Sequence, residues 1–218
     1  MGEEQRREPA QPMTRRERRL LAERGVPRIL TVCTGNICRS PLAETVLRAR
    51  LRDLGVEVSS AGTHAVVGHE MTRQAQELAT GRGADAGDAA AHRARFLVDP
   101  LLLEADLVLA MSREHRDEAV LLTPHRVHHV LTIRQFARLA AELDDDTIRS
   151  AADAAGPLAA QRLSHAVTTV SARSLGAGSD DDDVIDPYHR SDAVYEESAA
   201  QLDPGLAQVE RVVRLALA

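Results

Sequence analysis

The stretch VCTGNICRSP at residues 32–41 decides the fold. It continues a short apolar run at residues 29–32, typical of a buried strand, and it leads into a helical pattern that Ser40 would cap. Cys33 is therefore expected at the end of a strand, and Arg39 at the start of the following helix. The backbone N–H groups of such a loop and the helix N-terminus together favour binding of a tetrahedral oxyanion.

The residue types in this loop point to a thiolate nucleophile with an anion clamp. A free thiol has a pKa of ~8.5, and a helix N-terminus beside an arginine is a setting that favours the thiolate form of a cysteine. The Ser40 hydroxyl is placed to bond the thiolate, and Arg39 can hold two oxygens of an anion at once. Gly35 is expected to adopt a backbone conformation that larger residues resist, and Asn36 can tie the loop together through its amide.

The composition limits the class of protein. A chain of 218 residues, 44% hydrophobic, can form one domain, which would bury ~70% of its unfolded-chain surface. Aromatic residues make up only 2% and Trp is absent, so the core is expected to be aliphatic. The net charge of -6 argues against nonspecific nucleic-acid binding. No stretch approaches the ~20 apolar residues of a membrane span, so no membrane insertion is expected.

The basic residues and the cysteines narrow the chemistry. The chain contains arginine but no lysine, which excludes a Schiff-base lysine and a lysine-dependent nucleotide loop. Cys33 and Cys38 are its only cysteines; two cysteines form no zinc site, and a chain of this length needs no disulfide. None of the nine histidines has a clustered partner for a metal. A cytoplasmic location is therefore expected.

From residue 27 onward, apolar runs alternate with helical patterns. The predicted strands cover residues 29–32, 56–58, 106–111 and 127–131, and the predicted helices cover residues 41–54, 72–80, 99–104, 112–122 and 132–139. This alternation implies right-handed crossovers between parallel strands. The predicted fold is α/β with three layers, a Rossmann-like four-stranded parallel sheet with helices on both faces. The site is expected beyond the carboxyl ends of the strands, where Cys33 lies.

Two segments do not fit this alternation. Residues 1–26 are predicted to be an N-terminal extension, partly disordered, with a short arginine-rich helix at residues 15–24. The main domain is predicted over residues 27–218 and contains an insertion at residues 142–183, which is rich in Ala and Asp and partly helical. The end of the insertion, residues 176–183, is predicted to be a mobile loop.

One of three Asp-Pro pairs is expected to supply a general acid. Phosphoryl transfer to Cys33 leaves an alkoxide or phenoxide that a carboxylic acid must protonate. Asp99 and Asp203 each precede a helical pattern, where an aspartate acts as a cap. Asp203 also marks a break in a predicted final helix at residues 191–217. Asp186 precedes a loop instead, so it is the predicted acid.

Several motifs resemble, in the same order, those of the low-molecular-weight protein tyrosine phosphatases. They are CTGNICRSPLAE at residues 33–44, SAGT at 60–63, HRAR at 92–95, ADLVLAM at 105–111 and DPY at 186–188. The resemblance covers residues 28–141 and 184–217, and the first motif is highly specific. The resemblance implies that residues 27–218 form a phosphatase domain.

The resemblance implies a role for each site residue. Cys33 would be the nucleophile and would form a cysteinyl-phosphate intermediate, Arg39 would clamp the phosphate, and Asp186 would act as general acid and then as general base. The substrate-binding residues of the loop would be Thr34, Gly35, Asn36, Ile37, Cys38 and Ser40. Cys38 would pair with Cys33 under oxidation and protect it. The resemblance implies no metal and no cofactor.

The chain departs from the family pattern in three places. The extension and the insertion lie outside the usual compact domain, and the insertion directly precedes Asp186, so the acid loop is expected to be unusually mobile. Many relatives carry a large aromatic on the pocket wall, but residues 64–68 read HAVVG. Bacterial members that act on tyrosine kinases of polysaccharide export have a similar wall. Tyr188 is then the main aromatic candidate to stack on a phosphotyrosine ring.

The leading prediction is an enzyme that hydrolyses phosphotyrosine in proteins, with a bacterial tyrosine kinase as a candidate partner. An alternative is an arsenate reductase, because arsenate mimics phosphate and an external small thiol could reduce it. A third reading is a phosphotyrosine-binding or redox-sensing module. The combination of Cys33, Arg39 and Asp186 argues against that reading, because binding alone needs neither a thiol nor an acid.

Overall fold

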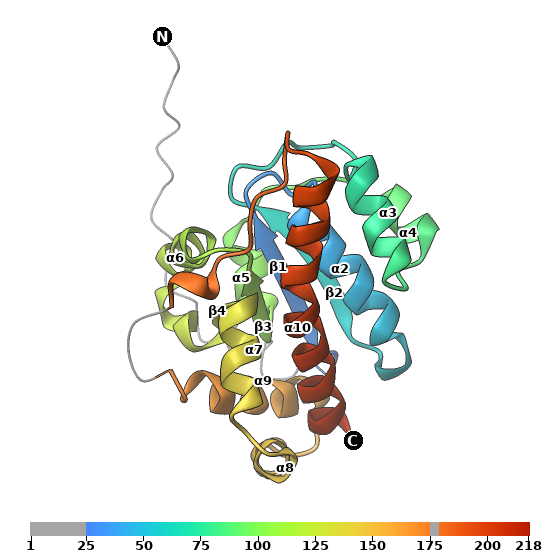
Figure 1. Cartoon of the computed structure of the whole chain (residues 1–218). Coiled ribbons are helices and arrows are strands. Elements are labelled where there is room, and N and C mark those ends of the chain that lie inside the picture. The colour runs from blue at the N-terminus through green and yellow to red at the C-terminus, as the bar shows by residue number, and fades with distance from the viewer. Residues whose placement is uncertain (1–24, 175–178) are drawn as a thin grey trace.

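The structure is a computed structural model and describes residues 25–174 and 179–218. Its sheet has four parallel strands in the order β2-β1-β3-β4 (Figure 1). The strands are β1 (Arg28–Cys33), β2 (Glu57–Gly62), β3 (Leu107–Ala110) and β4 (Val130–Thr132). The predicted four-stranded parallel sheet is confirmed. The helix predicted at residues 15–24 lies outside the described residues.

The register of the sheet brings the carboxyl ends of the strands to one edge. Cys33 pairs with Gly62 of β2, and Val32 pairs with Ala110 of β3. Ala110 in turn pairs with Thr132 of β4. Because β1 lies between β2 and β3, the loop that follows Cys33 begins in the interior of this edge rather than at its side.

The helices follow the alternating pattern of the sequence. In chain order, with short 3-10 helices as η, they are α2 (Arg39–Arg50), η1 (Arg52–Leu54), α3 (Arg73–Gly81), α4 (Ala86–Ala91), α5 (Asp99–Glu104), α6 (Arg113–Leu122), η2 (Pro124–His129), α7 (Ile133–Ala141), α8 (Asp145–Ala154), α9 (Ala159–Ser171), η3 (Asp180–Asp182) and α10 (Asp192–Leu217). Every helix predicted between residues 41 and 139 is present within a few residues of its expected bounds.

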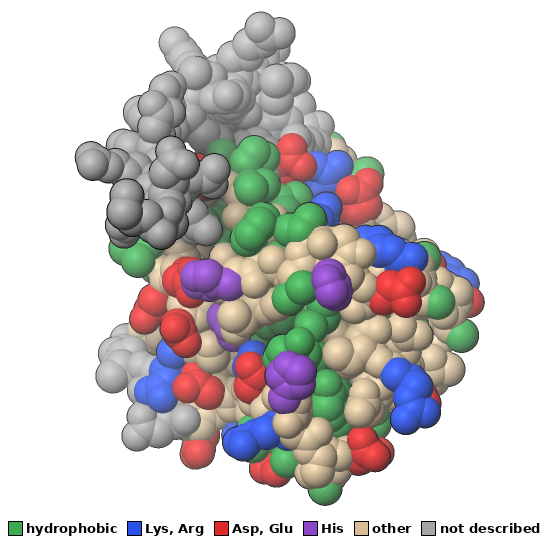
Figure 2. Space-filling model, turned by 90° about the horizontal axis from the view of Figure 1, so that it is seen from above, with side chains coloured by type: hydrophobic (Ala, Val, Ile, Leu, Met, Phe, Trp, Pro, Cys, Tyr) green, Lys and Arg blue, Asp and Glu red, His purple; other side chains and the backbone are tan. Residues whose placement is uncertain are grey.

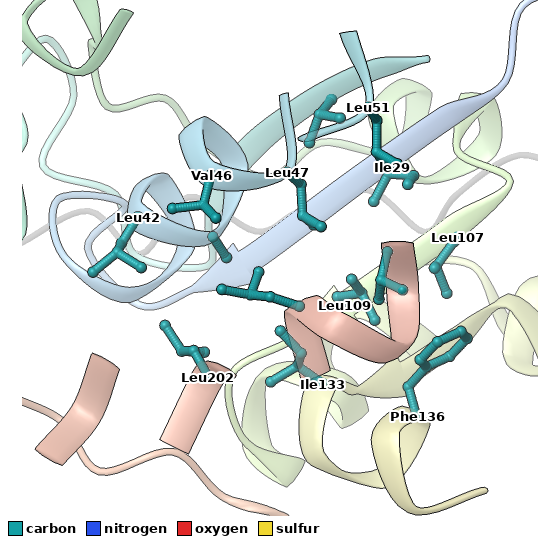
Figure 3. Close-up of a cluster of buried hydrophobic side chains, with 14 of the residues drawn as sticks. Ile29, Leu42, Val46, Leu47, Leu51, Leu107, Leu109, Ile133, Phe136 and Leu202 are labelled. Carbon is teal, nitrogen blue, oxygen red and sulfur yellow. The ribbon is translucent and has the colours of Figure 1, made fainter. Parts of the chain in front are cut away.

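Helices cover both faces of the sheet because successive residues of a strand point to opposite faces. Ile29 of β1 joins a cluster with Leu47 of α2 and Phe136 of α7, and this cluster also includes the buried face of α10 (Figure 3). Leu30, the next residue, joins a second cluster with Leu102 of α5. Both residues are apolar, as expected for a parallel sheet that is buried on both faces, and the predicted three layers are confirmed.

The insertion is more ordered than predicted. Its helices α8 and α9 pack against each other and against α10. Gly156, between these helices, has a left-handed φ of 96°. Where a mobile loop was predicted over residues 176–183, Ser179 caps the 3-10 helix η3; residues 175–178 lie outside the described part of the chain. The physical reason is the reciprocal capping of Ser179 and Asp182, which supplies both ends of this short turn with hydrogen bonds.

Two boundaries differ from the predicted ones. The fourth strand was predicted at residues 127–131, but a 3-10 helix runs to His129 and β4 begins at Val130. The Thr123 carbonyl accepts a hydrogen bond from the Arg126 amide and so starts the turn. The break predicted at Asp203 was wrong, since α10 continues through Pro204. Packing of α10 on several helices outweighs the hydrogen bond lost at Pro204.

Candidate active site

The loop after β1 places the Cys33 thiol beside a hydroxyl group at the start of α2. Cys33 is 2% exposed, and its Sγ lies 3.0 Å from the Ser40 Oγ at the start of α2. Asn36 has a φ of 56°, which lets the loop reverse. Gly35, which could adopt such a conformation more readily, does not have a left-handed φ. Asparagine tolerates the left-handed region because its short polar side chain bonds nearby groups.

A hydrogen-bond network beneath the loop orients the Ser40 hydroxyl. The Asn36 amide Nδ2 donates to the Ser40 Oγ at 3.0 Å and to the Ser60 Oγ at 2.7 Å. The Ser60 hydroxyl donates to the Glu44 carboxylate. The Ser40 oxygen accepts from Asn36, and its own hydrogen can point to the sulfur of Cys33 when that sulfur is a thiolate. The network thus offers the thiol a donor suited to a thiolate.

Glu44 anchors the far end of this network. It is 7% exposed, and burial by itself would raise the pKa of its carboxyl. Hydrogen bonds from His92 and Ser60, with the charge of Arg48, outweigh that effect and lower the pKa. His92 also bonds the Asn36 carbonyl oxygen through Nε2 at 2.8 Å. Glu44 is therefore a buried carboxylate held in its charged form, and it supports the loop from below.

Gly62 of β2 is required by close packing against the loop. A Cβ at this position would lie 2.4 Å from the Thr34 carbonyl oxygen and 3.0 Å from Asn36. The Thr63 amide next to it donates to the Cys33 carbonyl at 2.9 Å. The loop and the end of β2 are therefore held together backbone to backbone, which leaves no room for a side chain.

Arg39 links the loop to the Asp-Pro segment. Its side chain is 6% exposed, and Nη2 lies 2.7 Å from the Asp186 Oδ2. Nη1 donates to the Val184 carbonyl at 3.1 Å. Asp186 is half exposed, and its Oδ1 accepts from the Tyr188 amide at 3.2 Å. The structure thus brings together the three residues that the sequence proposed for catalysis, Cys33, Arg39 and Asp186, around one pocket.

This pocket has a volume of about 250 Å³ and opens at the carboxyl edge of the sheet. It is lined by Cys33, Thr34, Gly35, Ile37, Cys38, Arg39, His64, Val66, Asp186 and Tyr188. Figure 2 views this end of the molecule and shows hydrophobic and histidine side chains toward the centre with charged side chains around them. Asn36 and Ser40, both fully buried, lie behind the loop rather than in the lining. Tyr188 is 45% exposed on the rim.

A larger cavity of about 440 Å³ lies at the opposite, amino-terminal edge of the sheet, between Val26, Asp106 and α9. Neither cysteine lines it, so it is not a candidate for the same chemistry.

His115 is a site residue that the sequence analysis missed. It is 3% exposed on α6; its Nε2 lies 2.8 Å from the Thr34 Oγ1, and its Nδ1 lies 2.8 Å from the Ser112 Oγ. Burial and the charge of Arg39 lower the pKa of His115 to about 4, so the imidazole is neutral near pH 7. The spacing of Ser112 and His115 is that of a helix N-cap. This spacing gave no sign of a contact with the loop.

Cys38 lies in the wall of the pocket with its thiol held by two hydroxyl groups. Its Sγ is 3.5 Å from the Thr72 Oγ1 and 3.5 Å from the Tyr195 Oη. Burial raises the pKa of the Cys38 thiol, despite these hydrogen bonds. Both cysteines are free thiols. The two thiols of the loop therefore differ in environment, since Cys33 is the one that faces Ser40.

Neither a metal site nor a membrane span emerges from the described residues. Over residues 25–174 and 179–218, no group of three or more His, Cys, Asp or Glu side chains could hold a metal ion. Among the helices of the same ranges, none is both long enough and apolar enough to cross a membrane.

The sequence is similar to one family of phosphatases. The family profile for low molecular weight phosphotyrosine protein phosphatases matches residues 28–148. The phosphatase Etp of Escherichia coli K12 is 42% identical over 96 residues, which are 44% of this chain and 62% of Etp. The match therefore spans less than two thirds of that relative's length. The probable phosphatase EpsP of Ralstonia solanacearum is 36% identical over 117 residues, 54% of this chain and 76% of EpsP.

Solved structures of the same group resemble the fold. A low molecular weight protein tyrosine phosphatase from T. tengcongensis has a TM-score of 0.57 at 29% identity, covering 84% of this chain and 97% of its own. The arginine phosphatase YwlE from Geobacillus stearothermophilus has a TM-score of 0.58 at 28% identity, covering 84% and 90%. The tyrosine phosphatase amsI of Erwinia amylovora, at 22% identity, has a TM-score of 0.57 over 84% and 90% and shows the likeness of fold alone.

Proposed function

Because the chain belongs to the low molecular weight phosphotyrosine protein phosphatase family, we propose that it hydrolyses phosphotyrosine in proteins through a cysteinyl-phosphate intermediate. The observation that carries the proposal is the 2.7 Å contact between Arg39 and Asp186 at the mouth of the pocket that contains Cys33. Nucleophile, anion clamp and acid thus share one small cavity, which a binding module would not need.

In the proposed first step, the Cys33 thiolate attacks phosphorus and the bond to the tyrosine oxygen breaks. The loop N–H groups and Arg39 hold the phosphoryl oxygens, and protonated Asp186 donates its hydrogen to the departing phenolate. In the second step, Asp186 accepts a proton from water, which attacks phosphorus and releases phosphate. Cys33 leaves as a thiolate that the Ser40 hydroxyl, at 3.0 Å, stabilises.

The walls of the pocket favour an aryl phosphate. Ile37 and Val66 present apolar surface, and Tyr188 adds an aromatic ring on the rim. The lining contains only one carboxylate, Asp186, and it is paired with Arg39. No second carboxylate of the lining is available to bind the guanidinium of a phosphoarginine. This matters because a relative from Geobacillus stearothermophilus, 39% identical over 109 residues, is a protein-arginine-phosphatase.

The partners that we propose are phosphotyrosine proteins, with a bacterial tyrosine kinase as one candidate. A cytoplasmic location belongs to the same proposal, because Cys33 must remain a free thiol and reducing compartments preserve free thiols. Arsenate reduction with an external thiol is kept as an outcome of the test, since arsenate would fit the same loop.

The test compares purified enzyme with three substrates: a phosphotyrosine peptide, a phosphoarginine peptide, and arsenate with a small thiol. We expect phosphate release from the phosphotyrosine peptide, with kcat/KM at least tenfold above that for phosphoarginine, roughly 1.4 kcal/mol of discrimination. Acid quenching during turnover, followed by mass spectrometry, should find phosphate on the peptide that contains Cys33. Faster turnover of phosphoarginine, or arsenite formation without phosphate release, would overturn the assignment.

A further inference from the structure

The segment that joins the insertion to Asp186 is fixed to the body of the domain at several points. We call residues 179–185 the anchor segment. In Figure 1 it is the orange stretch that starts with η3 near α6 and α7 and then rises toward the first turn of α10. The anchor segment ends at the residue directly before the proposed general acid, so its position determines the position of the Asp186 backbone.

Asp182 fixes the first part of the anchor segment to α7. Its side chain is only 3% exposed, and its Oδ2 accepts a hydrogen bond from the Ser179 amide at 2.9 Å. The guanidinium of Arg138 on α7 lies 3.4 Å from the carboxylate. A buried carboxylate that loses its cationic partner is costly. The turn is thus held in one place relative to α7.

Asp183 fixes the next residue to the start of α6. Its Oδ1 accepts from the Arg113 backbone amide at 2.7 Å, and its Oδ2 accepts from the Arg113 Nη2 at 3.2 Å. Burial alone would raise the pKa of Asp183, but the bonds from Arg113 outweigh it and lower the pKa. The carboxylate therefore stays charged and holds both the backbone and the side chain of the same residue.

Backbone hydrogen bonds complete the attachment. The Val184 amide donates to the Met111 carbonyl beyond β3 at 2.8 Å, and the Val184 carbonyl accepts from Arg39 at 3.1 Å. The Ile185 amide donates to the Gln201 Oε1 of α10 at 2.8 Å. Helices α6, α7 and α10, together with Met111 and Arg39, thus hold residues 182–185, which directly precede Asp186.

We propose that Asp182 and Asp183 are positioning residues for Asp186, and that the end of the insertion is a fixed support for the acid loop. This inference rests on the proposed function. It assigns the insertion's last residues a part in the reaction without contact with substrate, and it replaces the expectation that the insertion loosens the acid loop.

Leaving groups of different basicity separate positioning of the acid from general damage. Phenolate is a poor leaving group and needs a proton as the P–O bond breaks. Nitrophenolate is a good leaving group and departs without one. Asp183→Ala displaces the acid but leaves Cys33, Ser40 and the loop in place. It should therefore slow phenyl phosphate hydrolysis much more than p-nitrophenyl phosphate hydrolysis.

The experiment measures kcat/KM for both substrates in the parent, Asp183→Ala and Arg138→Ala. Asp53→Asn is the matched control, because it weakens an ion pair of similar length, 2.9 Å to Arg214, that joins η1 to α10. We expect Asp183→Ala to lose about tenfold with phenyl phosphate and less than about twofold with p-nitrophenyl phosphate. Arg138→Ala should lower the two kcat/KM values in the same pattern, but by smaller factors than Asp183→Ala. Asp53→Asn should change neither kcat/KM value. Equal losses on both substrates, or no loss, would overturn the proposal.

Hydrogen exchange supplies a readout that does not need turnover. In Asp183→Ala, peptides covering residues 184–190 should exchange faster than in the parent, while Asp53→Asn should leave them unchanged. Unchanged exchange in Asp183→Ala would reject the anchor itself. If exchange rises but the parent hydrolyses no aryl phosphate, the proposed function fails and the attachment of the loop stands.

Discussion

The guanidinium of Arg39 lies 2.7 Å from the carboxylate of Asp186. The residue proposed to hold the phosphate therefore also holds the residue proposed to protonate the leaving group. In the proposed mechanism, phosphate oxygens that bind Arg39 would compete for the same N–H groups and leave Asp186 available as an acid. Binding and acid catalysis would then be coupled through this one guanidinium.

Cys33→Ser should abolish turnover while keeping the pocket. A serine hydroxyl at this position stays protonated, so kcat/KM on an aryl phosphate should fall by about 10⁴-fold or more. Inorganic phosphate should still bind, because Arg39 and the loop amides remain, and titration calorimetry can measure it. Substantial turnover in the variant would remove Cys33 from the mechanism.

Asp186→Asn should slow the reaction in a way that depends on pH. General acid catalysis contributes about 10²–10⁴-fold, so kcat/KM for phenyl phosphate should fall by an amount in this range. In the parent, the rate should decline toward high pH as the acid loses its proton, and in the variant this decline should flatten. A pH–rate profile of both proteins checks it; an identical shape would mean that another residue is the acid.

His115 should make stability depend on pH. Its pKa is lowered from 6.5 to about 4 in the folded chain, so between these values the unfolded chain binds a proton that the folded chain does not. Stability should therefore fall as pH drops through this window, by roughly 2–3 kcal/mol from this group. Urea unfolding of the parent and His115→Gln at pH 7 and pH 4.5 measures the difference.

The His115 substitution has an internal comparison. His129, whose pKa burial lowers to about 3, remains in the variant and should keep part of the pH dependence. If the unfolding free energy of His115→Gln depended on pH as strongly as that of the parent, His115 would bind its proton equally well in the folded and the unfolded chain.

Gly62→Ala should disturb the loop through the backbone. The added methyl group would lie 2.4 Å from the Thr34 carbonyl oxygen, so β2 or the loop must shift. Overpacking of this kind costs about 1–3 kcal/mol, and the displaced loop should also lower kcat/KM. Gly68→Ala, with nothing near its Cβ but a φ of 81°, is a control for backbone strain alone. Equal activity in the Gly62 and Gly68 variants would argue against the close approach.

The sequence predicted the sheet and the loop because their signals are local. Strand β1, the Cys33 loop and the start of α2 are contiguous, and period and capping rules apply to each of them. The contacts of Asp182, Asp183 and His115 were not predictable in this way. Each pairs with a residue on another element, and no spacing rule connects the two positions.

Pro204 illustrates the opposite error. Locally, a proline after Asp203 indicates a helix boundary. In the folded chain α10 continues through it. A Cβ on Gly205 would lie 2.4 Å from the Ile133 Cγ1, so α10 approaches α7 closely at this point. Asp203 meanwhile pairs with Arg82 at 2.8 Å. Tertiary packing here outweighs a single lost hydrogen bond, and only the structure reveals it.

A chain of hydrogen bonds connects Glu44 through Ser60 and Asn36 to Ser40, beside Cys33. The Ser60 hydroxyl gives its one hydrogen to the Glu44 carboxylate, so its oxygen is left to accept from one N–H of the Asn36 amide, whose other N–H reaches Ser40. Glu44 is not among the residues that line the pocket. The position of the Asn36 amide, and of the Ser40 hydroxyl that it contacts, is therefore supported from the reverse side of the loop, by a residue that substrates in the pocket would not meet.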